Sequence, residues 1–223
     1  MNKRSFLAAA AAALTIFTTS SFASDPVLKA GMDAAYPPFG SQDRKNREYV
    51  GYDVDIIRAI AKHAGFKVVV RNLAFDGLIP ALKTGAIDIA INDITISEER
   101  AKSVDFSHRY YIAGLGVVVN ADNKTIRTAK DLEGKRLAAS IGSTGEIAAK
   151  SVPGAKVRVF NELNECYLEL RNRGVDAVIN DIPTNDYYNV LQIKPLNDWF
   201  WYNWSSSPTG ASSCLAAAPS LPL

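Results

Sequence analysis

The fold of this protein is decided by the stretch Gly85-Ala-Ile-Asp-Ile-Ala-Ile-Asn-Asp-Ile-Thr-Ile-Ser-Glu-Glu-Arg100. Its first half carries Ile87, Ile89 and Ile91, which are β-branched and alternate at a period of two, as in a buried strand. Polar residues follow at the carboxyl end of that strand, namely Asn92, Asp93, Thr95, Ser97 and Arg100. Because open α/β sheets bind ligands outside the carboxyl ends of their strands, the stretch predicts a strand that leads into a binding loop.

A similar stretch occurs later in the chain. The sequence Val175-Asp-Ala-Val-Ile-Asn-Asp-Ile182 repeats Ile87-Asp-Ile-Ala-Ile-Asn-Asp-Ile94, and each copy follows a helix-like segment that ends in glycine. Two similar units predict two lobes of related topology, whose strand ends face each other across a cleft. The alternative is a chance similarity between two strands that are rich in valine and isoleucine.

Strand-like and helix-like segments alternate along the rest of the chain. Strands are expected at residues 27–32, 66–71, 136–140 and 156–160, and helices with N-caps at Asp53 and Asp76 follow the first two. This alternation predicts parallel strands and the α/β fold class. A polar break at residues 122–125 marks the expected crossing between lobes. We therefore expect lobe 1 at residues 24–118 and lobe 2 at residues 119–195.

Both ends of the chain differ from this pattern. Residues 1–23 carry Lys3 and Arg4, an apolar run and a small-residue site that ends at Ala23, which together predict a secretory signal peptide. A retained membrane anchor is the alternative, although the apolar run is short for a span. At the other end, residues 205–223 contain no charge and no periodicity. We expect residues 196–223 to be disordered, or to result from a frameshift or truncation.

Composition narrows the function classes. The chain has 223 residues, 48% of them hydrophobic, and a formal net charge of +2, so two small lobes with real cores are feasible and no basic stripe indicates nucleic acid. Cys166 and Cys214 are the only cysteines and have no metal-ligand spacing. An exported location would permit a disulfide, but core packing of Cys166 on a helix is the favoured interpretation. We expect no metal and no cofactor.

Charged groups of both signs stand at the predicted strand ends. Arg100 can offer a planar fork to a carboxylate, and Thr95 with the amides of residues 92–95 can add donors. The loop Gly142-Ser-Thr-Gly145 opens a helix, whose first amides also favour an anion. Asp181 is an acceptor suited to an ammonium group. An anion clamp opposite a carboxylate predicts a site for an α-amino acid.

Each of these residues also has a simpler interpretation. Arg100 can form a surface ion pair with Glu98 or Asp105, and Asp181 can cap the helix before Pro183. Ser143 and Thr144 can be an ordinary helix cap.

Taken together, the motifs resemble one protein family. They are Ala30–Phe39, Val50–Asp55, Phe75–Leu82, Asp88–Arg100 with Asp105-Phe-Ser107, Gly142–Gly145 and Asn180-Asp181. In this order and spacing, the chain resembles the periplasmic polar amino-acid-binding proteins of ABC importers, solute-binding protein family 3. The resemblance covers about residues 27–188. It implies a two-lobe periplasmic-binding-protein fold of type II, which would be incomplete at the C-terminus of this chain.

The resemblance also implies roles for individual residues. Arg100, Thr95 and Thr144 would hold the ligand carboxylate and Asp181 its ammonium, while Tyr36 and Phe75 would sandwich the side chain, for which core packing is the alternative. Asn92 and Ser143 complete the expected contacts. The implied protein is not an enzyme but a periplasmic monomer that closes its lobes on an amino acid and delivers it to a membrane permease.

One departure from the family bears on the ligand. The family usually has small residues where this chain has Asn92 and Asp93. If the Asp93 carboxylate enters the site beside Asp33, two negative groups select a cationic side chain, as in lysine, arginine, ornithine or histidine. If only the backbone of Asp93 faces the ligand, glutamine or another polar amino acid fits equally well.

Two further possibilities remain open at this point. The fold can host a small-acid dehydratase of the cyclohexadienyl dehydratase type, for which Glu146, Asp93 or His108 would have to act as general acid or base. His108 is better interpreted as a surface or packing residue. A truncated product without function is the other possibility.

Overall fold

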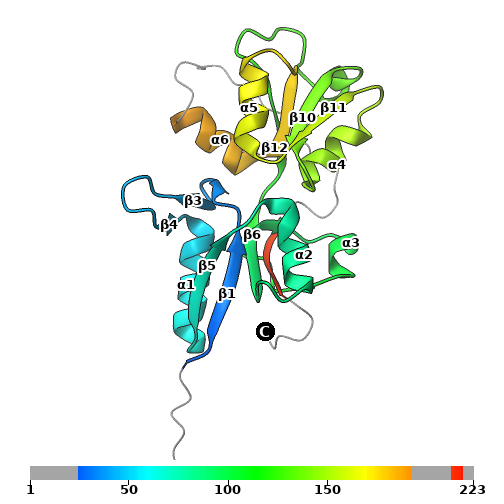
Figure 1. The fold of residues 1–223 in the computed structure, drawn as a ribbon. Coiled ribbons are helices and arrows are strands. Elements are labelled where there is room, and N and C mark those ends of the chain that lie inside the picture. Colours follow the sequence, from blue (N-terminus) through cyan, green and yellow to red (C-terminus); the bar gives the residue numbers. More distant parts are fainter. Residues whose placement is uncertain (1–24, 192–211, 218–223) are drawn as a thin grey trace, which may run out of the picture.

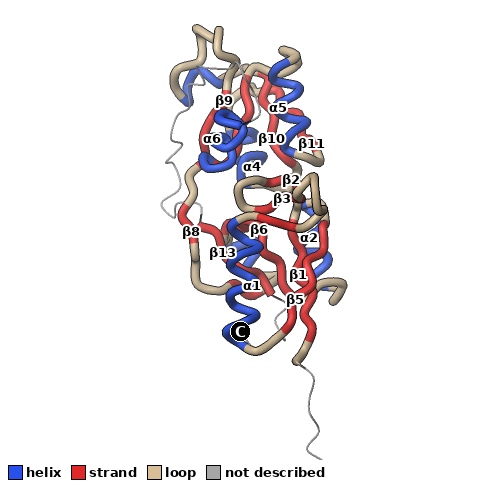
Figure 2. Tube along the Cα trace, turned by 90° about the vertical axis from the view of Figure 1, so that its left-hand side faces the viewer, coloured by secondary structure: helices blue, strands red, loops and turns tan. Residues whose placement is uncertain are grey.

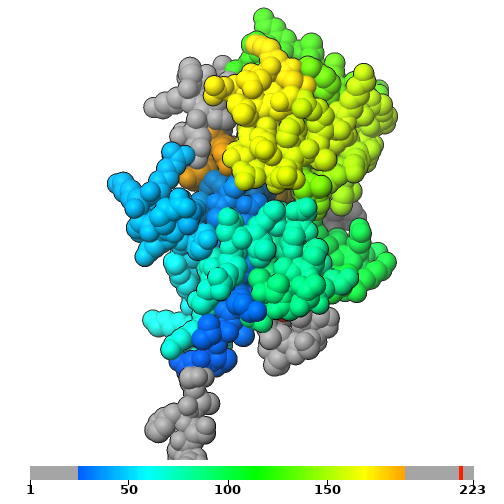
Figure 3. Space-filling model, viewed as in Figure 1, coloured from blue at the N-terminus to red at the C-terminus, as the bar shows by residue number. Residues whose placement is uncertain are grey.

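The computed structural model describes residues 25–191 and 212–217, which form two α/β lobes placed end to end (Figure 1). The predicted signal peptide lies outside these residues, as does the tail apart from residues 212–217. The α/β class and the two-lobe architecture are confirmed. In the space-filling view, lobe 2 rests directly on the upper surface of lobe 1 (Figure 3).

Lobe 1 is built on a six-stranded sheet in the order β5-β1-β6-β13-β7, with β8 paired to β13. Strands β1, β5 and β6 are mutually parallel, whereas β13 runs antiparallel to β6. The strands are β1 (Val27–Met32), β5 (Lys67–Asn72), β6 (Ile89–Thr95), β7 (Asp105–Phe106), β8 (Tyr111–Ile112) and β13 (Ser212–Ala217). The helices are α1 (Tyr52–Ala64), η1 (Phe75–Gly77), α2 (Leu78–Lys83) and α3 (Glu98–Ala101). A small antiparallel sheet adds β2 (Ala35–Tyr36), β3 (Gly40–Gln42) and β4 (Tyr49–Val50).

Lobe 2 has a four-stranded sheet in the order β11-β10-β12-β9. Its strands are β9 (Leu115–Val118), β10 (Arg136–Ser140), β11 (Lys156–Phe160) and β12 (Ala177–Asp181). Its helices are η2 (Ala129–Leu132), α4 (Thr144–Ser151), α5 (Leu163–Arg171) and α6 (Ile182–Leu191). The strand β10 is parallel to β11 and β12, and β9 is antiparallel to β12.

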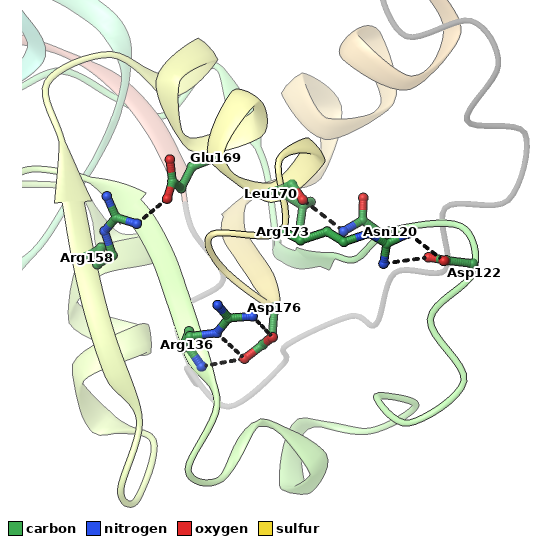
Figure 4. Close-up of polar contacts among 8 residues, drawn as sticks. All are labelled: Asn120, Asp122, Arg136, Arg158, Glu169, Leu170, Arg173 and Asp176. Atoms are coloured by element: carbon green, nitrogen blue, oxygen red, sulfur yellow. Dashed lines mark hydrogen bonds and ion pairs between the residues drawn. The ribbon is translucent and has the colours of Figure 1, made fainter.

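The two sheets repeat one topology, as the similarity of the two sequence stretches predicts. Strand β6 takes the same place in lobe 1 as β12 in lobe 2, since each pairs with the first strand of its βαβ unit on one side and with an antiparallel strand on the other. Equivalent aspartates make equivalent contacts: Asp88 accepts from the amide of Lys29 at 2.7 Å, and Asp176 from the amide of Arg136 at 2.9 Å. Asp176 also pairs with the Arg136 guanidinium (Figure 4).

Helix α1 shows how local sequence sets an element and where the prediction was wrong. The helix buries Val54, Ile57 and Ala61 and ends at Gly65, whose φ of 75° is the left-handed conformation that glycine favours. Its N-cap is Gly51, not Asp53, which lies inside the first turn and is fully buried. Asp76 likewise does not cap α2, because it lies within η1 and the N-cap of α2 is Gly77.

The crossing between the lobes comes earlier than expected. Strand β9 lies in the sheet of lobe 2, so the chain leaves lobe 1 after β8 and crosses at Ala113 and Gly114 rather than at residues 122–125 (Figure 2). The predicted boundary at residue 118 is therefore wrong by one strand. The carbonyl of Gly114 accepts a hydrogen bond of 2.8 Å from the amide of Ile182 in lobe 2.

Strand β13 corrects the prediction for the tail. Residues 212–217 lie within the segment expected to be disordered, yet they pair with β6, β7 and β8 in the centre of the lobe 1 sheet. Ala216 and Ala217 are fully buried there. Small side chains suit this position because the strand is covered by its neighbours, and the strand brings the chain back to the first lobe.

Candidate functional site

The carboxyl end of β6 departs from regular strand geometry at Asn92 and Asp93. The register between β6 and β13 shifts between Cys214 and Ala216, and Asp93 has a φ of 49°, in the left-handed region. Such bulges redirect side chains and are common beside functional sites. Ile91 and Ile94 on either side stay in the core, so the irregularity is confined to the two polar residues.

A cavity between the lobes collects the polar groups that the sequence singles out. Every residue predicted to bind the ligand lines it: Asp33, Tyr36, Phe75, Asn92, Asp93, Thr95, Arg100, Ser143, Thr144 and Asp181. Ser140, Leu163 and Asn180 line it too and were not predicted. Asn180 could have been found, since it occupies the position of Asn92 in the sequence repeat. The cavity has a volume of about 20 Å³, room for about one water molecule.

Arg100 reaches the cavity from the short helix α3. The Ser97 hydroxyl accepts from the Arg100 amide at 3.2 Å and forms the N-cap of this helix. The guanidinium lies over the Phe75 ring, 5.3 Å from its centroid, and donates at 2.9 Å to the carbonyl oxygens of Thr95 and Gly142. A cation from lobe 1 therefore faces the first turn of α4 in lobe 2.

The glycine-rich loop of lobe 2 starts α4 at the edge of the cavity. Ser143 is the N-cap, as its alternative interpretation predicted: its hydroxyl accepts from the Glu146 amide at 3.1 Å. Gly142 takes a φ of 72°. At Gly145 a Cβ would lie 2.4 Å from the carbonyl oxygen of Ile179, so only glycine lets α4 begin this close to β12.

Two buried carboxylates face the cavity from opposite lobes. Asp181 accepts from the Tyr36 hydroxyl through Oδ2, while its Oδ1 is buried with no hydrogen-bond partner in the described chain. The Oδ2 atom of Asp93 is likewise buried and has no hydrogen-bond partner among the described residues. Burial raises the pKa of Asp181 to about 6, and burial together with the charges of Asp181 and Asp53 holds the pKa of Asp93 well above its usual range. Both carboxylates would be stabilised by a cation.

Other polar atoms at the cavity are also without partners. The Nδ2 atom of Asn92 and the hydroxyl of Ser140 are buried and make no hydrogen bond to the described residues. Native proteins pair nearly all such groups. The Oδ1 atom of Asn92, in contrast, accepts from the Asp33 amide at 2.6 Å. Donors and acceptors thus lie ready for a ligand that carries both kinds of group.

Asp33 lies where this cavity meets a second, more open one. It is mostly buried, accepts from the Ala35 amide at 2.9 Å, and lines both spaces. The outer cavity, about 530 Å³, is lined by Asp33, Ala34, Ala35, Gln42, Asn72, Ala74, Asp76, Asn161 and Glu162. None of these lining residues, all within the described chain, is basic. Burial raises the pKa of Asp33, and the negative charges of Glu162 and Asp76 add to that shift.

The repeated lobes, the crossing of the chain between them and a charged site at their interface define a type II periplasmic-binding-protein fold. Within this class, the chain belongs to the bacterial extracellular solute-binding proteins, family 3, whose sequence profile matches residues 28–194. Within the described part of the chain, helices long and apolar enough to cross a membrane are absent.

Two proteins with similar sequences are named for amino acids. The chain is 38% identical over 158 residues to a protein of Campylobacter jejuni named "Probable histidine-binding protein", covering 70% of this chain and 60% of that protein. It is 35% identical to the L-cystine-binding protein TcyJ of Escherichia coli, covering 69% and 58%. The chain thus spans about 60% of the length of these relatives.

A solved structure shows the same fold. An ancestral arginine-binding protein bound to arginine superposes with a TM-score of 0.80 at 37% identity, covering 88% of this chain and 86% of that one.

Proposed function

We propose that this chain is the periplasmic substrate-binding component of an amino-acid ABC importer, and that it binds a cationic L-α-amino acid by closure of its lobes. The observation that carries the proposal is one interlobe cavity that contains the Arg100 guanidinium and the buried carboxylates of Asp93 and Asp181. A zwitterion with an additional positive charge matches this set of groups.

The acid end of the ligand fits beside Arg100. A carboxylate accepts two parallel charge-assisted bonds from a guanidinium, and the Thr95 and Thr144 hydroxyls can add donors. The N-terminus of α4, which opens at the same cavity, also favours a negative group. We propose that the ligand carboxylate takes the place of the Thr95 and Gly142 carbonyls as acceptor for the fork.

The amine end fits at Asp181. Its Oδ1 is buried and unpartnered, which is costly for an acceptor that holds a charge. An α-ammonium group would supply the missing donor. Tyr36, which donates to the other oxygen, keeps the carboxylate in place.

The side chain of the ligand would run between Tyr36 and Phe75 toward Asp93 and Asp33. Asp181 is sufficient for the ammonium, so Asp93 and Asp33 are additional negative groups, and they favour a cationic side chain over a neutral one. The outer cavity beyond Asp33 gives room for a long side chain such as that of arginine or lysine. The Campylobacter jejuni relative named for histidine and the arginine-bound structure support this choice, whereas the relative named for L-cystine does not.

The size of the cavity supports binding by lobe movement. An amino acid does not fit in about 20 Å³, so the lobes or their side chains have to move apart before it enters. The chain crosses between the lobes at Ala113 and Gly114, which places a two-residue link next to the site. Hinge closure of this kind is known for periplasmic binding proteins.

The enzyme alternative has less support. Of its candidate acid–base residues, only Asp93 lines the cavity. The Glu146 carboxylate instead accepts from the Gly142 amide at 2.6 Å and pairs with Lys150, and the protein relatives above are named as binding proteins. Export by the signal peptide at residues 1–23, delivery to a permease and a monomeric state complete the proposal.

A ligand screen tests the proposed function. Purified mature protein would be heated with each of the twenty amino acids and ornithine, followed by calorimetry for those that raise the melting temperature. We expect the largest shifts with arginine, lysine, ornithine or histidine. Stabilisation by glutamine alone would contradict the choice of ligand, and conversion of prephenate or arogenate would contradict the choice of a receptor over an enzyme.

A further inference from the structure

Asp53 lies behind the ligand cavity, where it contacts the backbone of Asp93. It is fully buried on the first turn of α1 and does not line the cavity. Its Oδ2 accepts from the Asp93 amide at 2.8 Å, and its Oδ1 accepts from the Tyr110 hydroxyl at 2.6 Å. Both oxygens of this buried carboxylate are therefore used, one for each of two distant segments.

The first of these contacts holds an unfavourable backbone conformation. A residue other than glycine at a positive φ is strained and persists only where its surroundings impose that conformation. Asp93 has a φ of 49°. Its amide points to Asp53 instead of a neighbouring strand, and its Oδ2 is left buried at the cavity with no partner. The direction of the ligand-facing carboxylate thus depends on Asp53.

The second contact reaches the segment that crosses between the lobes. Tyr110 directly precedes β8, and Gly114 in the crossing accepts from the amide of Ile182, the neighbour of Asp181. Residues 110–114 are therefore linked to Asp93 through Asp53 and to the Asp181 backbone through Ile182. Asp93 and Asp181 are therefore both connected to this segment, each through one intervening residue.

We infer that Asp53, fixed by Tyr110, is a positioning residue that directs the Asp93 carboxylate at the cationic side chain of the ligand, so that specificity depends on two residues outside the cavity. The inference rests on the proposed function. Removal of the Tyr110 hydroxyl leaves one oxygen of a buried carboxylate without a donor, and Asp53 then shifts or takes up a proton. In either case the hydrogen bond that fixes the Asp93 backbone is weakened, whereas the contacts of Arg100 with Thr95 and Gly142 and of Asp181 with Tyr36 involve neither Asp53 nor Tyr110.

A purely structural role makes a different prediction. Tyr110 also packs against the core of lobe 1, so loss of packing would weaken the binding of every ligand to the same extent. Loss of positioning would weaken only ligands whose side chain carries a positive charge. The ratio of the dissociation constants for glutamine and arginine separates the two roles.

The test compares Tyr110→Phe, which keeps the ring, with Tyr49→Phe, a control at a half-buried tyrosine in β4 that does not line the cavity. Calorimetry with L-arginine and L-glutamine gives the ratio for each variant. We expect Tyr110→Phe to lower the ratio about tenfold, which corresponds to about 1.4 kcal/mol, mainly through weaker arginine binding. The control should leave the ratio unchanged. Added to Asp93→Asn, Tyr110→Phe should change the ratio no further, because it acts through Asp93.

The results of these measurements distinguish a failure of the positioning role from a failure of the proposed role of Asp93. Suppose first that the wild-type protein prefers arginine and that Asp93→Asn removes that preference. If Tyr110→Phe then leaves the ratio unchanged, or weakens the binding of both ligands equally, the positioning role is overturned and the proposed function stands. If the wild-type protein shows no preference for arginine, or Asp93→Asn leaves the preference intact, the assigned role of Asp93 fails and the inference fails with it.

Discussion

The guanidinium of Arg100 in lobe 1 donates a hydrogen bond of 2.9 Å to the carbonyl oxygen of Gly142 in lobe 2. The other terminal nitrogen of this guanidinium donates to the carbonyl oxygen of Thr95 in lobe 1. The cation proposed to hold the ligand carboxylate therefore also contacts both lobes, at the loop where α4 begins. Loss of this side chain should affect ligand capture and lobe closure together.

Arg100→Ala should abolish measurable amino-acid binding. Arg100→Lys should keep a charge but lose the planar fork, and we expect roughly 100-fold weaker binding from the loss of a bidentate pair. Arg58→Ala, which changes an exposed arginine on α1, is the matched control and should bind normally. Calorimetry with the best ligand of the screen measures all three, and retained affinity in Arg100→Ala would contradict the clamp.

Asp93→Asn should reduce the preference for cationic amino acids. A hydrogen bond to a charged group contributes about 1.5–3 kcal/mol, so we expect the affinity for arginine to fall by roughly 10- to 100-fold. Glutamine binding should change little or improve. Asp55→Asn removes the same charge from an exposed position on α1 and serves as control. Equal losses for arginine and glutamine would argue that only the backbone of Asp93 matters.

Ligand binding should weaken in acid because Asp181 must be ionised to pair with an ammonium group. Burial raises the pKa of Asp181 from 3.8 to about 6, so we expect affinity to fall by up to about tenfold for each pH unit below 6. Isothermal titration between pH 4.5 and 8 measures this fall. An affinity that stays constant down to pH 4.5 would contradict a role for Asp181 as the ammonium acceptor.

The stability of the ligand-free protein should change with pH in the opposite direction. The pKa values of Asp181 and Asp53 in the folded state, each about 6, lie above the ordinary 3.8. These groups therefore favour the folded state most below pH 4, and that contribution is lost as the pH rises through 6. Urea unfolding of the Asp181→Asn variant beside the wild type isolates the contribution of Asp181, since the variant should lack that part of the pH dependence.

Gly145→Ala should destabilise lobe 2 and distort the site. The added Cβ would lie 2.4 Å from the Ile179 carbonyl, and such overpacking costs about 1–3 kcal/mol. Gly77→Ala is a matched control, because nothing lies within 4 Å of its Cβ and its φ is −83°. It should be neutral or stabilise by about 0.4–1 kcal/mol. Thermal unfolding compares the two, and equal melting temperatures would refute the close approach of α4 to β12.

Much of the architecture could be predicted because it depends on local pattern. The alternation through Ile87, Ile89 and Ile91 predicted a strand, which is observed as β6 from Ile89 to Thr95. Gly65 ends α1 in the left-handed conformation that glycine favours, and Ser97 caps α3. The sequence repeat indicated that β6 and β12 are equivalent. Since the carboxyl ends of parallel strands meet at one edge, the polar residues after them were expected together, and they line one cavity. Their contacts with a ligand stay a prediction.

The features that the sequence did not predict correctly depend on contacts between segments that are distant in the chain. Asp53 precedes an apolar helical pattern and so resembles an N-cap, but its carboxylate is occupied by the Asp93 amide and the Tyr110 hydroxyl, which only the folded chain brings near. The apolar run of β9 has no local feature that assigns it to one lobe. Residues 212–217 show no periodicity, and they form a strand because they pair with the backbone of β6. Side-chain periodicity is a local property, whereas backbone pairing partners are chosen by the whole sheet.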